Sequence, residues 1–237
     1  MKQSIRSNTP DIQIRFWIAE ASLPSFDEAA LHAVTNDLHL TILINNVGGT
    51  HSLSNDFKTF ESTTPTEIEA LFNINVRFTF LTTRFLLPIL TRSGPGNALI
   101  LNSGSHACVG TPYMAAYSGT KAFLNAWSRG LKAELRAEVA TRHVDVVTIL
   151  IGTTQSNQIK TAAGWMVPTA REMAKGALVQ ASGRWVWSRV WGGWTTRSGW
   201  WMHAVQNWVV SGLLPEAWAG MLAVMVLKPV MEGKKTL

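Results

Sequence analysis

The sequence predicts an α/β protein built around a parallel sheet, and two observations lead to this prediction. Short apolar runs rich in β-branched residues alternate with longer amphipathic stretches along the 237 residues. The runs end in small or polar residues that are typical of turns, at 45–49, 103–105 and 152. Strands that alternate with helices form parallel sheets, and ligands bind beyond the carboxyl ends of such strands. We therefore expect the functional residues at those ends.

The first predicted elements lie before residue 50. Residues 12–19 (IQIRFWIA) are β-branched and aromatic, so they are predicted to form a strand. An amphipathic helix is expected over roughly 25–38. Residues 41–47 (TILINNV) are apolar up to Asn45 and Asn46 and are followed by Gly-Gly, which indicates a buried parallel strand and its turn.

The next predicted helix has a clear start. Thr64 can cap it, Pro65 suits the first helical position, and Glu67 completes a capping box. The later predicted elements are a strand at 97–105, a helix of about 25 residues from near Met114, and a strand at 144–152.

Charge and tryptophan divide the chain into two regions. Residues 1–150 contain 12 basic and 12 acidic side chains, whereas residues 151–237 contain 9 basic and 3 acidic ones, so the net charge of +6 lies in the second region. Eight of the eleven tryptophans lie in the same region, from Trp185 onward. Within one domain, we expect a core at 1–160 and a substrate-lid and membrane-associating region at 161–237. The single Cys108 excludes an intramolecular disulfide and fits a reducing compartment.

Tyr117 and Lys121 lie four residues apart in AAYSGTKAFL, and this spacing places both on one face of a helix. A free tyrosine has a pKa of about 10, and a neighbouring ammonium group favours the phenolate. With a serine hydroxyl to hold a carbonyl oxygen, such a pair can protonate a ketone as hydride arrives, or catalyse the reverse. Taken alone, the spacing also fits surface or packing roles.

The order of the motifs is more specific than any one of them. NNVG at 45–48, Asn75, NSGS at 102–105 and YSGTK at 117–121 follow one another in a way that resembles the short-chain dehydrogenase/reductase family. LINNVGG, LLP at 86–88, the helix containing YSGTK and the Trp-rich end look most like very-long-chain 3-oxoacyl-CoA reductases and their 17β-hydroxysteroid dehydrogenase relatives. The resemblance covers about 12–237 and implies a Rossmann-type, doubly wound parallel sheet.

The resemblance implies roles for individual residues. Tyr117 would be the catalytic acid/base. Lys121 would lower the pKa of Tyr117 and bind the nicotinamide ribose, and Asn75 would support a water-linked proton relay. Asn45 and Gly48 would form the loop that passes the adenosine side of the cofactor and steadies the sheet.

The catalytic serine is less clearly placed, and a second cofactor loop follows later. The usual family spacing from the tyrosine leads to Gly104, whereas the Asn-x-Gly-Ser pattern leads to Ser105, which we favour, with Ser103 as the fallback. In the later loop, Gly152 and Ser156 match positions that close over the nicotinamide.

The glycine-rich turn of the family, which receives the cofactor's pyrophosphate at a helix N-terminus, has no counterpart, because no glycine precedes Gly48. Residues 12–19 resemble the third family strand, so the Rossmann-type sheet is expected to be N-terminally truncated, with its first two strands missing. Residues 41–47 would then form an apolar sheet edge. Either 12–19 move in beside them, another chain pairs with the edge, or the protein is poorly stable.

The tryptophan-rich C-terminal region is expected to be helical and apolar. It fits a substrate lid or, as we favour, docking on a membrane surface; its tryptophan spacing does not fit nucleic-acid binding. Its apolar runs are shorter than the roughly 20 residues of a membrane-spanning helix. The final KKTL matches a dilysine retrieval signal, so the expected location is the cytosolic face of the endoplasmic reticulum membrane.

The leading functional hypothesis is NADP(H)-dependent ketone reduction or alcohol oxidation on a hydrophobic substrate, such as a 3-oxoacyl thioester, a steroid-like ring or a secondary-metabolite intermediate. NADP rests on the resemblance, and NAD remains an alternative. The six histidines have no metal-ligand spacing, so no metal is expected. The competing hypothesis is an inactive, membrane-associated protein that forms a homo-oligomer or pairs with a full-length relative.

Overall fold

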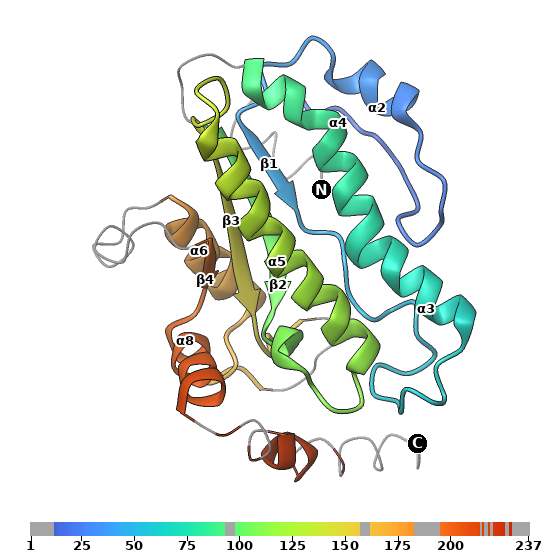
Figure 1. Ribbon diagram of the computed structural model, residues 1–237, viewed down its shortest axis with the longest axis vertical. Helices are drawn as coiled ribbons and strands as arrows, with labels where there is room; N and C mark the ends of the chain where they lie inside the picture. Colours follow the sequence, from blue (N-terminus) through green and yellow to red (C-terminus); the bar gives the residue numbers. More distant parts are fainter. Residues whose placement is uncertain are drawn as a thin grey trace.

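A computed structural model of the chain describes residues 12–92, 98–156, 162–182 and 195–213, with 215, 218, 220–225 and 228 beyond them. The predicted α/β architecture is confirmed: four parallel strands form one sheet in the order β1-β2-β3-β4, flanked by helices (Figure 1). The strands are β1 Ile42–Asn45, β2 Ala98–Ser105, β3 Val144–Ile151 and β4 Thr196–Ser198.

The predicted helices also form, with shorter bounds for the first. The helices are α2 Glu28–Thr35, α3 Pro65–Phe72, the π-helix Asn73–Arg77, α4 Phe78–Arg92, the 3-10 helix His106–Val109, α5 Ala115–Ala137, α6 Ala170–Ala181, α8 Trp201–Trp208 and the π-helix Val209–Leu213. The capping box that starts α3 is present: the Glu67 backbone N–H donates to the Thr64 side chain, and the Thr64 backbone N–H donates to the Glu67 carboxylate.

One face of the sheet is closed by α2, α4 and α5, of which α4 and α5 lie in front of the strands in Figure 1. Side chains alternate across a strand, so every second residue points to this face. The buried core on this side draws on all three helices and on the first three strands: Leu31, Leu43, Leu86, Ile89, Leu90, Ala98, Ile100, Leu135, Val144 and Val146.

The other face carries a smaller core against α6. Leu101 of β2 and Val147 and Ile149 of β3 pack with Met173 of α6, and Trp200 lies at the margin. This cover stops before β1, because Ile42 and Ile44 are 55% and 51% exposed. The strand β1 is also the edge of the sheet in the described residues, as expected for 41–47.

The prediction of a strand at 12–19 is wrong. The structure has no strand between residues 12 and 20, so this segment does not pair with β1. It packs beside the helices instead: the Trp17 ring stacks on Phe78 of α4, with centroids 5.6 Å apart, and meets Phe26 edge-on. Arg15 forms an ion pair with Asp37, after α2. A β-rich composition makes a strand only where a neighbouring strand can complete its hydrogen bonds.

The region after residue 160 belongs to the same sheet, because β4 pairs with β3. Most of the Arg- and Trp-rich stretch, at 183–194, and the KKTL end lie outside the described residues. Among the residues that the structure describes, none of the helices has both the length and the apolar character needed to cross a membrane.

Candidate functional site

Tyr117 and Lys121 lie in the first turns of α5, as the spacing predicted. Lys121 is only 3% exposed, and its Nζ atom lies 5.7 Å from the centroid of the Tyr117 ring. The same Nζ donates a 3.1 Å hydrogen bond to the Ser103 carbonyl oxygen at the end of β2. Burial lowers the pKa of Lys121 to about 8, so its amine is still mostly protonated at neutral pH. The helix therefore holds a buried cation at the carboxyl edge of the sheet.

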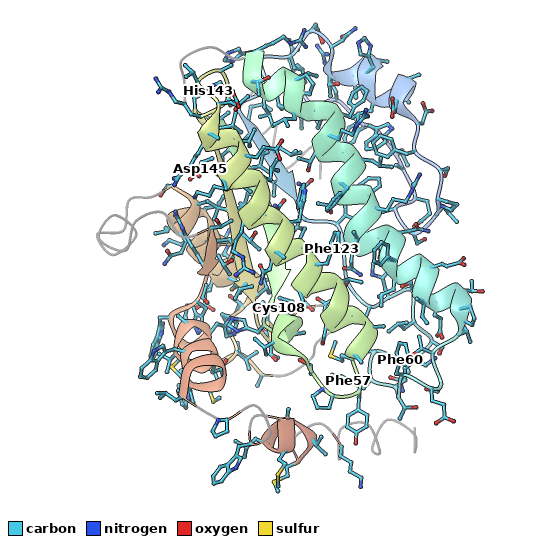
Figure 2. All side chains as sticks on the ribbon, viewed as in Figure 1. Phe57, Phe60, Cys108, Phe123, His143 and Asp145 are labelled. Atoms are coloured by element: carbon cyan, nitrogen blue, oxygen red, sulfur yellow. The ribbon has the colours of Figure 1, made fainter. Side chains whose placement is uncertain are left out.

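Three neighbouring influences shift the pKa of the Tyr117 phenol. Burial raises the pKa of Tyr117 above its ordinary value, a hydrogen bond with the Ser105 side chain lowers it, and Cys108 raises it. Cys108 lies on the turn between β2 and α5 (Figure 2). Burial is the largest of these effects, and the lowering of the pKa of Tyr117 by Lys121 stays a prediction of the resemblance.

The end of β2 contains the three positions considered for the catalytic serine, 103, 104 and 105. Successive side chains point to opposite faces, and Gly104 faces the packed neighbour strand: a Cβ there would lie 2.7 Å from Thr148 Cγ2. A serine at 104 would therefore collide with β3. The Ser105 hydroxyl accepts from the Ala107 N–H and bonds to Tyr117, whereas the Ser103 hydroxyl donates to Asn46. The structure brings Ser105, rather than Ser103, to the phenol.

Asn75 holds the loop that follows β1. It lies in the π-helix between α3 and α4 and is almost fully buried. Its Nδ2 atom donates to the Gly49 carbonyl at 2.8 Å and to the Leu71 carbonyl at 3.0 Å, and its Oδ1 atom accepts from the Gly49 N–H at 2.9 Å. Gly48 and Gly49 have φ angles of 154° and 141°, in the region that favours glycine. Asn75 therefore fixes the strained part of this loop.

Gly48 joins this loop to the Tyr–Lys pair. A Cβ atom on Gly48 would lie 2.8 Å from Asn75 Oδ1 and 3.0 Å from Lys121 Nζ. Asn75, Gly48, Lys121, Tyr117 and Ser105 therefore meet along the carboxyl edge of β1 and β2, although they come from four separate parts of the chain.

Asn45 points into the protein rather than toward the loop. Its Nδ2 atom donates to Thr83 of α4 at 3.0 Å and to Asn102 of β2 at 2.8 Å, and Asn102 donates in turn to Ser128 of α5 at 2.9 Å. All four are buried. This network ties the sheet to both helices beneath the site, so Asn45 supports the site from within.

Gly152 and Ser156 lie in the loop after β3, and Ser156 is exposed. The Gly152 N–H donates to Nδ1 of His203, on α8, at 3.3 Å. His203 also meets His106, the residue after Ser105, with ring centroids 5.3 Å apart. Sequence reasoning missed both histidines, since no spacing rule relates residues 106, 152 and 203. Among the described residues, no group of three metal-ligating side chains comes together.

Comparison with known proteins places this geometry in a family. Residues 4–166 match the family model for short chain dehydrogenase. The chain is 37% identical over 189 residues to the very-long-chain 3-oxoacyl-CoA reductase of Neurospora crassa, a match that covers 78% of this chain and 52% of that protein. The chain thus spans about half the length of the curated relatives it matches.

Solved structures share the fold at low sequence identity. A 7β-hydroxysteroid dehydrogenase studied for its stereoselectivity matches with a TM-score of 0.73 and 17% identity, over 93% of this chain and 80% of that one. A 3-ketoacyl-(acyl-carrier-protein) reductase from Brucella melitensis, complexed with NADH, matches with a TM-score of 0.60 and 22% identity, over 76% and 74%. On the family match and the shared fold, this chain belongs to the short-chain dehydrogenase family.

Proposed function

We propose that this chain is an oxidoreductase that reduces a ketone, or oxidises the corresponding alcohol, with NADP(H) on a hydrophobic substrate. One observation carries the proposal: the Tyr117 phenol lies beside the Ser105 hydroxyl at the carboxyl edge of the sheet, one helical turn from a buried lysine. This arrangement provides a proton donor, a group that holds oxygen and a cation in one place.

Each residue has a step in the proposed reduction. The Ser105 hydroxyl donates to the substrate carbonyl oxygen and holds it against the phenol. When bound, the reduced dinucleotide supplies the hydride that adds to the carbonyl carbon. Tyr117 transfers its phenolic proton to the oxygen, which gives the alcohol and a phenolate. Lys121 stabilises that phenolate, and Asn75 supports the water chain that returns the proton.

The described residues fit the nicotinamide end of a dinucleotide. Lys121 is a buried cation that donates to the Ser103 carbonyl, and an ammonium group has three N–H donors, so it can also donate to ribose hydroxyls. Gly48 leaves a space beside Lys121 and Asn75 that any Cβ would fill. Gly152 and Ser156 would complete this end from the loop after β3, and Asn45 would steady it from below. The choice of NADP over NAD rests on the family resemblance.

The proposed substrate class is a 3-oxoacyl thioester. The support is the 37% identity to a reductase named for such a substrate. Steroid-like rings and secondary-metabolite ketones are the other hydrophobic substrates that the site chemistry permits.

The test of the chemistry uses the chain's two tyrosines. We expect Tyr117→Phe to keep the fold and lower the reduction of a long-chain 3-oxoacyl-CoA by about 10²-fold or more, because it loses the proton donor. The matched control is Tyr113→Phe, which removes the same hydroxyl four residues earlier. Equal activity in the Tyr117→Phe variant and the wild type would overturn the proposed mechanism.

The test of the cofactor is a calorimetric titration of the wild-type chain with NADPH and, in parallel, NADH. We expect micromolar binding, weakened about tenfold or more in Lys121→Ala because bonds to a charged donor are lost. No binding of either dinucleotide at millimolar concentration would overturn the enzyme proposal for this chain.

Membrane-surface docking is a second part of the proposal, with the cytosolic face of the endoplasmic reticulum as the location. It is supported by exposed apolar side chains at helical spacing near the C-terminus. They are Trp201, Val205 and Trp208 on α8, and Trp218, Met221, Leu222 and Met225 after it. Aromatic and aliphatic side chains of this kind insert at the boundary between headgroups and acyl chains.

Flotation with vesicles tests this docking. We expect the wild type to float with vesicles that contain phosphatidylserine, and the double variant Trp201→Ser with Trp208→Ser to bind several-fold less. The control, Phe60→Ser, removes an exposed aromatic residue on a distant loop. Equal flotation of all three proteins would contradict a role for α8.

The alternative function is a non-catalytic binding protein that forms a homo-oligomer or pairs with a full-length relative. It is supported by the β1 edge and its exposed Ile42 and Ile44. A chain that binds no dinucleotide but sediments as a defined oligomer, or co-purifies with such a relative, would favour this function over the enzyme.

A further inference from the structure

Among the residues of α8 whose burial the structure describes, His203 is the most deeply buried, and most of the others are exposed. It is 1% exposed, whereas Trp201, Val205 and Trp208 on α8 face outward. A buried imidazole needs partners for its two nitrogens, because an unpaired polar group in the interior is unfavourable. The position of His203 is therefore not explained by burial of apolar surface.

The first contact of His203 is with the loop that follows β3. The Gly152 N–H donates to Nδ1 at 3.3 Å, so the ring proton is placed on Nε2. A Cβ on Gly152 would lie 2.8 to 2.9 Å from three atoms of the ring. The ring thus approaches the backbone of Gly152 to a distance that glycine alone allows.

The second contact is with the turn that carries Ser105. The next residue, His106, meets the His203 ring at an angle of 64°. Burial, together with a smaller effect of the His203 charge, lowers the pKa of His106 to about 4. Burial also lowers the pKa of His203, whereas hydrogen bonds with the backbone of Thr153 and Met166 raise it by a smaller amount. Two neutral rings at neutral pH can pack together without repulsion.

Other bonds hold the same helix and loop in place. The Trp200 indole N–H, at the start of α8, donates to the Trp165 carbonyl at 2.9 Å. The Gln155 N–H donates to the Pro168 carbonyl at 2.9 Å, which fixes the far end of the loop. The hydrogen bond from the Gly152 N–H to His203 joins α8 to the start of this loop, directly after β3.

We propose that His203 is a positioning residue that fixes the loop at Gly152–Ser156 and aligns it with the turn at Ser105. The His203 side chain on α8 then holds two parts of the site in position. They are the loop proposed to close over the nicotinamide and the Ser105 hydroxyl proposed to hold the substrate carbonyl. This inference rests on the proposed function for its catalytic meaning, but its contacts can be tested without cofactor.

The test compares two variants that both remove the ring. In His203→Asn, the Oδ1 atom can replace Nδ1 as the acceptor, whereas His203→Leu keeps the bulk without an acceptor. We expect amide exchange at Gly152 to accelerate about tenfold in His203→Leu and to stay near the wild-type rate in His203→Asn. NADPH affinity should weaken about tenfold in the leucine variant and by less than about threefold in the asparagine variant.

The outcomes separate positioning from packing. A purely structural role predicts that the two variants lose equal affinity, in proportion to their loss of thermal stability, and that result would overturn the proposal. Wild-type protein that binds no dinucleotide would overturn the proposed function instead. In that case the amide exchange at Gly152 decides. Faster exchange in His203→Leu but not in His203→Asn supports the positioning of the loop by His203, and unchanged exchange in both variants overturns it.

A second pair of variants tests the close approach directly. Gly152→Ala should lower the melting temperature, and adding His203→Ala should restore part of the loss, because the ring no longer occupies the space of the new Cβ. Gly130→Ala on α5, where a Cβ meets nothing within 4 Å, is the control and should be independent of His203. Simple additivity of Gly152→Ala and His203→Ala would contradict the contact.

Discussion

The two faces of the sheet are built differently. On the face covered by α2, α4 and α5, Ile100 is fully buried and its neighbours form one continuous core. On the other face, α6 covers β3 and part of β2, and the side chains of Ile42 and Ile44 remain about half exposed. The same strand, β1, is therefore a core strand on one side and a surface strand on the other.

This difference shows where stability and chemistry come from in this chain. The closed face holds the buried polar network and the lysine that support the candidate site, so most of the site is held by packed helices. The open face contributes the His203 contact through α8 but leaves the β1 edge with apolar side chains in water. The candidate site therefore lies at the carboxyl end of β1, the strand whose Ile42 and Ile44 are the least covered.

The largest expected effect contrasts two isoleucines on the two faces. We expect Ile100→Ala to lower the free energy of unfolding by about 2–5 kcal/mol, because it leaves a cavity in a closed core. Ile44→Ala should change it by less than about 1 kcal/mol, because the side chain is 51% exposed. Urea unfolding measures both. Similar losses would mean that the second face is covered in solution.

The next effect concerns the charge buried on the closed side. Lys121→Met should stabilise the protein at pH 7 by about 2 kcal/mol, because it removes a cation that burial disfavours and loses one hydrogen bond. Burial lowers the pKa of Lys121 from 10.5 to about 8. Between these values the unfolded chain binds a proton that the folded chain does not, so wild-type stability rises with pH there.

The control for this charge is Lys175→Met on the exposed surface of α6. Chemical denaturation from pH 7 to pH 10 should give a difference between wild type and Lys121→Met that shrinks as pH rises. A difference that stays constant over this range would show that Lys121 is not desolvated in the folded protein.

The polar network gives an intermediate effect. We expect Asn45→Ala to cost about 1–3 kcal/mol, because Asn102 and Thr83 lose a buried partner. Asn46→Ala, one residue later and exposed, should stay within about 0.5 kcal/mol. Thermal unfolding followed by circular dichroism compares them. Equal shifts for the two variants would argue against a network that ties β1 to the helices.

The smallest effect on stability is expected on the open face itself. Ile44→Thr should leave the melting temperature within a few degrees, roughly 2–4 °C, but reduce self-association, because it makes the exposed face of the edge strand polar. Sedimentation velocity over a range of concentrations measures this. Leu43→Thr, which points to the closed core, is the comparison and should instead destabilise the protein. Unchanged association in Ile44→Thr would remove the support for an interaction through this face.

The sequence predicted those elements that local patterns define. The capping box at Thr64 and Glu67 marked the start of α3, and the apolar runs marked β1, β2 and β3 within a few residues. Tyr117 and Lys121 could be placed on one helix face, because helical spacing is a local property. The segment at 12–19 was wrongly predicted as a strand, since its composition says nothing about whether a neighbouring strand exists.

The sequence by itself determined the α/β architecture, the order of its elements and the candidate Tyr–Lys pair, because these follow from periodicity and caps within short windows. The tertiary structure decided which serine meets the phenol, because the Ser105 hydroxyl bonds to Tyr117 whereas the Ser103 hydroxyl donates to Asn46. It also decided the raised pKa of Tyr117 and the contact between His203 and Gly152. These depend on desolvation and on distances between residues far apart in the chain, which form only when the helices pack against the sheet.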